Sequence, residues 1–165
     1  MPFRETEDYI VETVATVCLK KYKAHPSGIF TVCDLGCGSG IILISILKKL
    51  LLEPSSKKIH MKVIDISNAY VVNTVNELRA FNVDILSIMP QCTSVFKMHP
   101  EDIQADFLYV FWRRSDLARF SWKDIRATTI VSYKHPIHEL KHNLVSTMRS
   151  TSIYHVYENI YIYET

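Results

Sequence analysis

The glycines of this chain are concentrated in one short stretch, which constrains the fold more than any other feature. The chain has 165 residues and only four glycines, and three of them, Gly36, Gly38 and Gly40, lie within five positions in VCDLGCGSGIILI. Glycine is used where the backbone turns unusually or where another group approaches it closely. An apolar run, 29–35, precedes the stretch, and another follows it. The pattern therefore predicts a strand, a tight glycine loop and a helix in direct succession.

The rest of the chain alternates between strand-like and helix-like segments. We expect helices over 6–23, 40–52, 68–81 and 117–125, and strands over 29–35, 58–66, 83–89, 105–112 and 127–133. The end of the chain, TSIYHVY and NIYIYE, alternates around Glu158-Asn159 and predicts a closing β-hairpin. Strands separated by helices imply a parallel sheet covered on both faces. The expected fold class is α/β: a doubly wound, mainly parallel, seven-stranded sheet with a C-terminal β-hairpin.

Composition and charge exclude several classes of protein. A length of 165 residues suits one domain, 1–165, in which 1–24 form an N-terminal helical segment. The net charge of +2 is too small to argue for nucleic acid or an anionic membrane. The longest apolar run, 41–52, contains two lysines and is shorter than the about 20 residues that a membrane-spanning helix needs. The N-terminus lacks an apolar signal core and the cysteines form no disulfide framework, so we expect a cytoplasmic location. We also expect the protein to be a monomer.

The glycine stretch lies where α/β sheets bind ligands, because it leaves a strand at its carboxyl end and opens a helix. A phosphate-binding P-loop needs Lys and then Ser or Thr after the last glycine, whereas Gly40 is followed by two isoleucines. The dinucleotide fingerprint G-x-G-x-x-G also fails, since the spacing here is Gly36-x-Gly38-x-Gly40. The stretch closely resembles the D/E-x-G-x-G-x-G loop of class I S-adenosylmethionine (SAM) methyltransferases.

This resemblance implies that SAM is the cofactor and that its methionyl part lies against the loop backbone. The carboxylate of Asp34 would face the SAM amino group, directly or through water. The next strand ends in Asp65, which would accept the ribose hydroxyls, and Ile66 would pack on the adenine. An alternative for Asp65 is that it caps the helix that follows. The implied SAM-binding residues in these two regions are Asp34, Gly36, Cys37, Gly38, Gly40, Asp65 and Ile66.

Three further stretches resemble the small protein-lysine methyltransferases, a family that includes an archaeal broad-specificity enzyme and mitochondrial enzymes acting on the ATP synthase c-subunit and the adenine nucleotide translocase. They are PFRETEDYIVETV, ADFLYVF, and TTIVSYKHPI with the closing IYIYE. The segment ADFLYVFWRRSD also lacks the Asn/Asp-Pro-Pro-Tyr/Phe motif of many adenine and glutamine methyltransferases, which disfavours those acceptors.

The family resemblance implies methyl transfer from SAM to the amine of a protein lysine by direct in-line displacement, with no metal. Thr6 would fold over the cofactor. Tyr109 and Trp112 would line the acceptor channel, where aromatic rings suit both sulfonium and ammonium groups; the alternative for these rings is a core role. The family usually has an acidic residue near the adenine after the third strand, and here Gln91 or Cys92 takes that place.

Two other functions stay open on the sequence alone. Methylation of RNA or of a small molecule is compatible with Arg113-Arg114 and with the generic nature of the SAM loop. A non-catalytic binding protein with this fold is compatible with Ser39, which stands where the family commonly has an acid. The histidines of the C-terminal third match no Cys/His spacing typical of a metal site, so no metal is expected.

Overall fold

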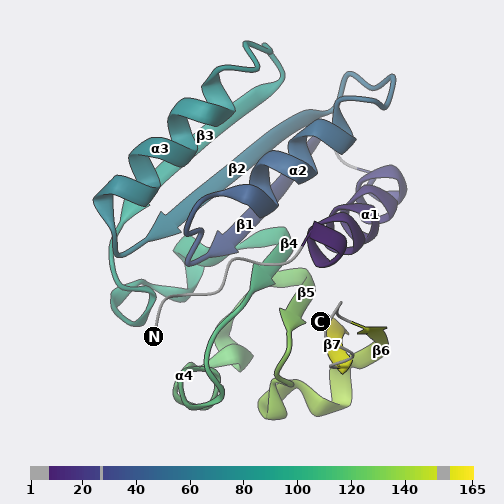
Figure 1. Cartoon of the computed structure of the whole chain (residues 1–165), viewed down its shortest axis with the longest axis vertical. Helices are drawn as coiled ribbons and strands as arrows, with labels where there is room; N and C mark the ends of the chain where they lie inside the picture. Colours follow the sequence, from purple (N-terminus) through teal and green to yellow (C-terminus); the bar gives the residue numbers. More distant parts are fainter. Residues whose placement is uncertain (1–7, 27, 152–156) are drawn as a thin grey trace.

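The strand-like and helical segments of the sequence assemble into one twisted sheet with segments packed on both of its faces (Figure 1). The computed structural model describes residues 8–26, 28–151 and 157–165. The strands are β1 (Ile29–Leu35), β2 (Lys58–Asp65), β3 (Leu86–Cys92), β4 (Ala105–Val110), β5 (Ala127–Tyr133), β6 (Leu144–Thr151) and β7 (Tyr157–Glu164). The helices are α1 (Asp8–Ala24), α2 (Ile41–Leu50), α3 (Asn68–Arg79) and α4 (Arg114–Arg119), with short 3-10 helices at Val95–Lys97, Pro100–Ile103, Trp122–Asp124 and His138–Asn143.

The order of the strands places a switch point beside β1. The sheet runs β3-β2-β1-β4-β5-β7-β6, so the chain moves outward from β1 to β3 and then returns to β4 on the other side of β1. The first five strands are parallel, and β7 pairs antiparallel with both β5 and β6. The connections after β1 and β4 leave in opposite directions, and ligands bind at such a point. The predicted α/β fold class is confirmed.

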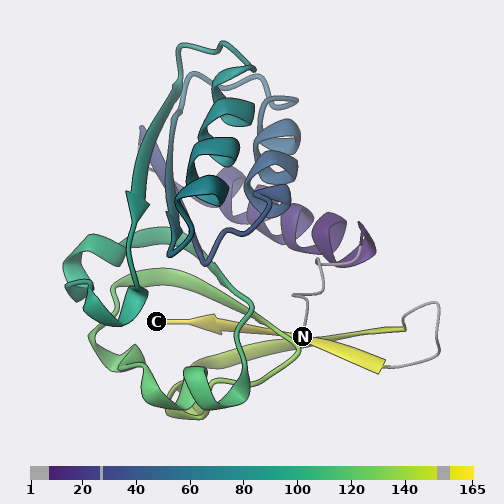
Figure 2. The ribbon, with the colours of Figure 1, turned by 60° about the vertical axis from the view of Figure 1, so that its left-hand side comes forward.

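Two hydrophobic cores lie on opposite faces of the sheet, because successive side chains of a strand point to opposite sides. In β4, Phe107 and Tyr109 face the core under α1, α2 and α3, while Leu108 and Val110 face the second core. The second core is covered by α4 and the 3-10 segments, including the buried ring of Trp122. Figure 2 shows α1, α2 and α3 together on one side of the sheet. The sheet is therefore covered on both faces, as the sequence pattern predicted.

Most elements differ from their predicted bounds by one or two residues, and three of the differences bear on the site or on the core. β3 begins at Leu86 and continues through Pro90 to Cys92, rather than spanning 83–89. β3 is an edge strand, where a proline is tolerated because one side of the strand has no partner. β4 ends at Val110, so Trp112 lies beyond it. α4 ends before the Trp122–Asp124 turn, so the predicted helix over 117–125 is two shorter elements.

The C-terminal hairpin is present, but its predicted turn at Glu158-Asn159 was wrong. Glu158 and Asn159 lie inside β7, where they pair with Ser150 and Arg149 of β6. The polar character of Glu158 indicated a turn, yet its buried carboxylate accepts hydrogen bonds inside the fold. The residues that join the two strands are outside the described part of the chain.

The predicted N-terminal helix is present as α1. The predicted cofactor residue Thr6 lies before it, outside the described residues. Within the described ranges, none of the helices has the length and apolar character that crossing a membrane requires.

Candidate functional site

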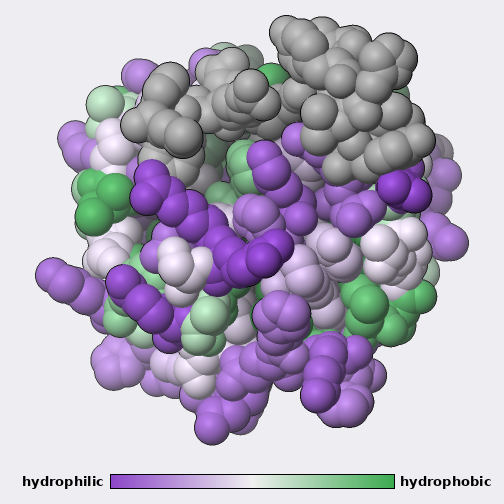
Figure 3. Space-filling model, turned by 60° about the horizontal axis from the view of Figure 1, so that its bottom comes forward, coloured by the Kyte–Doolittle hydropathy of each residue, from purple (hydrophilic) through white to green (hydrophobic). Residues whose placement is uncertain are grey.

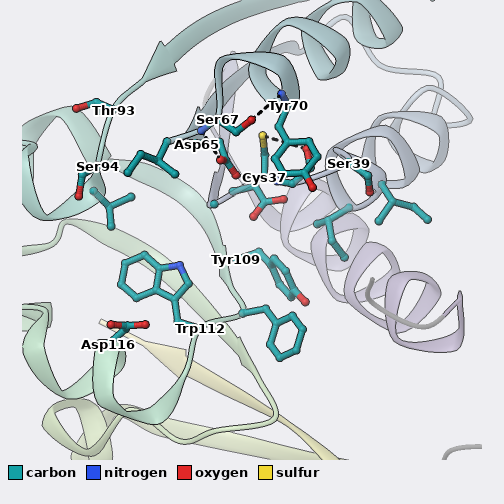
Figure 4. A pocket seen from close by; sticks show the side chains of 18 of the residues that line it. Cys37, Ser39, Asp65, Ser67, Tyr70, Thr93, Ser94, Tyr109, Trp112 and Asp116 are labelled. Atoms are coloured by element: carbon teal, nitrogen blue, oxygen red, sulfur yellow. Dashed lines mark hydrogen bonds between the residues drawn. The ribbon is translucent and has the colours of Figure 1, made fainter. Parts of the chain in front are cut away.

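A cavity of about 450 Å³ opens at the carboxyl ends of β1, β2 and β4, next to the switch point (Figure 4). The glycine loop and the start of α2 form one wall, and the segment from Asp65 to Tyr70 forms the next. The residues after β3, 93–96, and those after β4 close the other side. Strand ends that are far apart in the sequence thus meet around one space, as the doubly wound topology requires.

The glycine loop turns sharply because its three glycines have left-handed backbone angles. The φ angles of Gly36, Gly38 and Gly40 are 85°, 51° and 78°, a region that side chains with a Cβ rarely adopt. The N–H groups of Gly36 and Cys37 both donate to the carbonyl of Ile64, at 2.9 Å each. The predicted succession of strand, glycine loop and helix is confirmed.

The three glycines have different surroundings. Gly36 and Gly38 line the cavity, whereas Gly40 is buried at the start of α2. A Cβ on Gly40 would lie 2.4 Å from the Oγ1 atom of Thr74 in α3. Gly40 therefore allows α2 and α3 to pack closely behind the loop, while the other two leave room at the cavity.

Asp65 holds its carboxylate at the edge of the cavity through two backbone donors. Its Oδ2 atom accepts from the N–H of Gly38 at 3.0 Å, and its Oδ1 atom accepts from the N–H of Ser67 at 2.8 Å. The cap of α3 is Ser67, whose Oγ atom accepts from the N–H of Tyr70, so Asp65 is not the capping residue. Each carboxylate oxygen has a second lone pair for a ligand donor.

Asp34 presents a buried carboxyl group to the same cavity. Asp34 is only 2% exposed. No side chain or backbone group in the described part of the chain donates a hydrogen bond to its carboxyl group. Burial raises the pKa of Asp34 well above its ordinary value, and the nearby carboxylate of Asp65 raises it further. Because Asp34 lines the cavity, a donor or a cation of a ligand bound there would meet its carboxyl group.

Large apolar side chains form the opposite part of the wall. Ile66 is 76% exposed, Tyr70 is 45% exposed and Phe96 is 41% exposed, and all three line the cavity. Cys92 does not line it; its thiol lies 3.5 Å from the carbonyl of Ile66, and the wall continues from Thr93. The sequence analysis missed Tyr70 and Phe96. Tyr70 could have been found, because it lies in the first turn of the helix that follows Asp65, next to the cavity. No feature of the sequence indicates that Phe96 lines the cavity.

Tyr109 and Trp112 lie on the far side of the cavity from Asp65 and Cys37 (Figure 4). The indole N–H of Trp112 donates to the carbonyl of Leu35 at 2.8 Å, which fixes the ring against the end of β1. The same ring packs on Phe96, Phe120 and Trp122, with centroids 5.2–5.7 Å apart. Trp112 therefore belongs to an aromatic cluster and also lines the cavity.

Cys37 is a small buried residue of the loop, and its thiol is unreactive. Burial raises the pKa of its thiol to about 12, with the carboxyl group of Asp34 as the next cause. Its sulfur lies 3.8 Å from the Oγ1 atom of Thr74. A thiol that stays protonated at neutral pH is a poor nucleophile, so Cys37 contributes shape to the cavity.

Of the comparisons with known proteins, only the comparison with solved structures finds similar proteins, and it supports the fold. No protein-family model and no curated protein matches the chain. The O-methyltransferase TomG from Streptomyces achromogenes, in complex with SAM, is 11% identical with a TM-score of 0.64, over 100% of this chain and 83% of that one. Magnesium protoporphyrin IX methyltransferase from Synechocystis PCC 6803, with bound SAM, is 13% identical with a TM-score of 0.59, over 96% and 85%.

A protein-modifying enzyme is similar to the same degree. The ribosomal protein L11 methylase from Lactobacillus delbrueckii subsp. bulgaricus is 19% identical with a TM-score of 0.61, over 95% of this chain and 80% of that one. Identities this low establish the fold and leave the reaction open. The chain has the Rossmann-like fold of class I SAM-dependent methyltransferases.

Proposed function

We propose that this chain is a SAM-dependent methyltransferase. The observation that carries the proposal is the pair of carboxyl groups, Asp34 and Asp65, that faces the cavity along the glycine loop. No lysine, arginine or histidine of the described residues forms an ion pair with either of them. SAM carries an ammonium and a sulfonium group and a ribose diol. It would supply the cations that both carboxyl groups lack among the described residues, and hydroxyl donors for the remaining lone pairs of Asp65.

The residues of the cavity fit the parts of SAM. Asp34 would accept from the amino group, and Asp65 would accept from the ribose hydroxyls with its remaining lone pairs. Gly36 and Gly38 would let the methionyl part pass against the backbone. The exposed apolar side chains of Ile66 and Tyr70 would cover the adenine. When bound, SAM supplies an electrophilic methyl group for in-line displacement, and no metal is needed.

The acceptor that we propose is the side-chain amine of a protein lysine. The side of the cavity beyond the glycine loop is formed by Tyr109, Phe111 and Trp112, with the carboxylate of Asp116 next to them. A free lysine amine has a pKa of about 10.4 and arrives as an ammonium. Aromatic faces and a carboxylate stabilise such a cation. The lysine would give its proton to solvent, and its nitrogen would then form a bond to the methyl carbon as the bond from that carbon to the SAM sulfur breaks. The resemblance to protein-lysine methyltransferases supports the same acceptor.

Calorimetric titration with SAM tests the cofactor. The wild type should bind SAM in the micromolar range, and Asp65→Ala should weaken binding at least about tenfold, because a hydrogen bond to a charged group contributes about 1.5–3 kcal/mol. The matched control is Asp84→Ala, since Asp84 is an exposed acid that precedes β3, away from the cavity. Absence of binding to the wild type would overturn the proposal.

Acid hydrolysis after incubation with methyl-labelled SAM and a protein extract tests the acceptor. Label should be recovered as methyl-lysine, and Asp65→Ala should abolish it. Label in nucleic acid or in a small molecule would replace the lysine proposal, while SAM binding without any transfer would indicate a non-catalytic binding protein.

A further inference from the structure

Cationic side chains gather beside the cavity, where α4 begins and where β5 ends. Trp112 and Asp116 line the cavity, and the two residues between them that carry positive charge, Arg113 and Arg114, are exposed. Arg119 lies at the other end of α4, and Lys134 follows β5 directly. We call this group the basic rim: Arg113, Arg114, Arg119 and Lys134.

Two different elements contribute members of the basic rim. The positive charges of Arg114 and Lys134 both lower the pKa of His135, after burial, which is the larger cause. The start of α4 and the segment after β5, 20 residues apart in the sequence, therefore both add positive charge to the surroundings of His135. Figure 3 shows the face that comes forward when the α4 end of Figure 1 is tilted toward the viewer, and hydrophilic residues cover much of its described part.

The charges of the rim arginines are not neutralised within the described chain. Its ion pairs involve lysines or His25, and none involves Arg113, Arg114 or Arg119. Lys134 lies 3.9 Å from a carboxylate oxygen of Glu158, a group that also accepts from the Tyr133 hydroxyl. The rim therefore keeps a net positive charge that a partner can use.

The interior of the cavity has the opposite charge. Asp34, Asp65 and Asp116 line it, and among the described residues no lysine, arginine or histidine does. With SAM placed as proposed above, Asp34 and Asp65 face the cofactor, and Asp116 is the carboxylate on the acceptor side. A partner that matches this layout carries a cation at its centre, which enters the cavity, and anions around it, which meet the rim. A lysine within an acidic stretch of protein has this arrangement. Arginine suits the outer contacts because its planar fork binds carboxylates with two parallel hydrogen bonds.

The aromatic rings near the rim fit a nucleic acid less well. Single-stranded nucleic acids are held by free ring faces on which bases stack. Here Phe120 packs on Trp112 and on Trp122, with centroids 5.2 and 4.7 Å apart. The guanidinium of Arg119 covers Phe96 at 4.3 Å. These contacts engage the rings within the protein, so the rim presents mainly point charges.

We infer that the basic rim docks an acidic segment of the acceptor protein and so places a lysine of that segment at the cavity. The inference rests on the proposed function, because it concerns the acceptor of the same site. It adds a requirement that the cavity alone does not set: acidic residues on either side of the target lysine.

Fluorescence anisotropy with a labelled peptide tests the inference without any need for turnover. The probe has one lysine between runs of glutamate, and the matched probe has glutamine in place of each glutamate. The acidic peptide should bind the full chain about tenfold more tightly than the glutamine peptide at low salt, as several exposed ion pairs together provide. High salt should remove most of the difference.

Variants assign the effect to the rim. The double variant Arg113→Gln, Arg114→Gln should lose most of the preference for the acidic peptide. Arg79→Gln, an exposed arginine at the end of α3, is the charge-matched control and should keep the preference. Circular dichroism and thermal unfolding of each variant separate a lost contact from a lost fold.

Three outcomes would overturn the inference. These are equal binding of the two peptides, an acidic preference that survives the double variant, and tighter binding of a single-stranded RNA oligonucleotide with the same arginine dependence. Calorimetry with SAM on the same preparations distinguishes this failure from failure of the proposed function. A preparation that binds SAM but binds the acidic and the glutamine peptides equally would contradict the role of the basic rim and leave the proposed function standing.

Discussion

The Oδ2 atom of Asp65, at the end of β2, accepts a hydrogen bond from the N–H of Gly38 at 3.0 Å. One carboxylate thus joins two neighbouring strand ends, because Gly38 belongs to the loop that leaves β1. The loop conformation and the proposed ribose contact therefore depend on the same side chain. A change at Asp65 should affect stability and cofactor binding together.

Asp65→Asn tests the effects of the carboxylate on stability and on cofactor binding while most of the side chain is kept. An asparagine offers a single acceptor oxygen, so either Gly38 or Ser67 loses its acceptor, which should lower the free energy of unfolding by about 1–3 kcal/mol. SAM affinity should also fall, by about tenfold or more. Urea unfolding and calorimetry measure the two effects, with Asp84→Asn as the control. A variant as stable as the wild type would mean that these N–H groups have other acceptors.

The buried carboxyl group of Asp34 should make stability depend on pH. Its pKa is raised in the folded state, so between the unfolded value of about 3.9 and the folded value, the folded state binds more protons. Stability therefore falls as pH rises through that window. Asp34→Asn removes the titrating group, so its unfolding free energy should change less with pH from pH 4 to 8. The comparison needs urea midpoints for both proteins at each pH, and parallel curves would contradict the assignment.

The same carboxyl group should couple proton release to cofactor binding. An ammonium group beside Asp34 favours the ionised form, which lowers the raised pKa when SAM binds. Binding should thus release protons below the apo pKa of this group. Calorimetry in buffers of different ionisation enthalpy detects such protons, and Asp34→Asn should show no dependence of the binding enthalpy on the buffer.

The sequence predicted those parts of the fold whose causes are local. β1 and β5 have the predicted bounds, since each is a short stretch rich in apolar and β-branched residues that ends at a loop. The glycine loop was predictable because Gly36 and Gly38 have a left-handed backbone, which glycine adopts readily since it has no Cβ. The resemblance to the SAM loop directed attention to Asp34 and Asp65, and both line the cavity because each lies at the carboxyl end of its strand.

Features that depend on distant partners were not predictable. The buried carboxylate of Glu158 accepts from Tyr133 and from Tyr9, which is 149 residues away in the sequence. No local pattern could distinguish that arrangement from a polar turn. Phe96 reaches the cavity only because the segment after β3 crosses in front of Trp112, and such a path is set by tertiary packing.

Gly40 and Gly28 form a matched pair for testing the packing of α2 on α3. An alanine at Gly40 would need a left-handed backbone, which costs about 1–2 kcal/mol, and its Cβ would overlap Thr74 at 2.4 Å. Together with overpacking, Gly40→Ala should lower the unfolding free energy by about 3 kcal/mol. A Cβ at Gly28 meets no atom within 4 Å, so Gly28→Ala should have little effect.

A double variant separates the two causes. Gly40→Ala combined with Thr74→Ala should be less destabilised than the sum of the single variants, because the overlap disappears while the backbone strain remains. Additive free energies from urea unfolding would show that Thr74 does not limit the space at Gly40.

The two tryptophans of the chain should report differently on cofactor binding. Trp112 lines the cavity, whereas Trp122 is buried in the second core and donates its indole N–H to the carbonyl of Leu117. SAM should therefore change the tryptophan emission of the wild type and of Trp122→Phe. Trp112→Phe should lose that change and should also be about 1 kcal/mol less stable, since the carbonyl of Leu35 loses its donor. Fluorescence titration with excitation at the red edge of the tryptophan band measures the signal. An emission change that survives in Trp112→Phe and disappears in Trp122→Phe would mean that SAM binds away from this cavity.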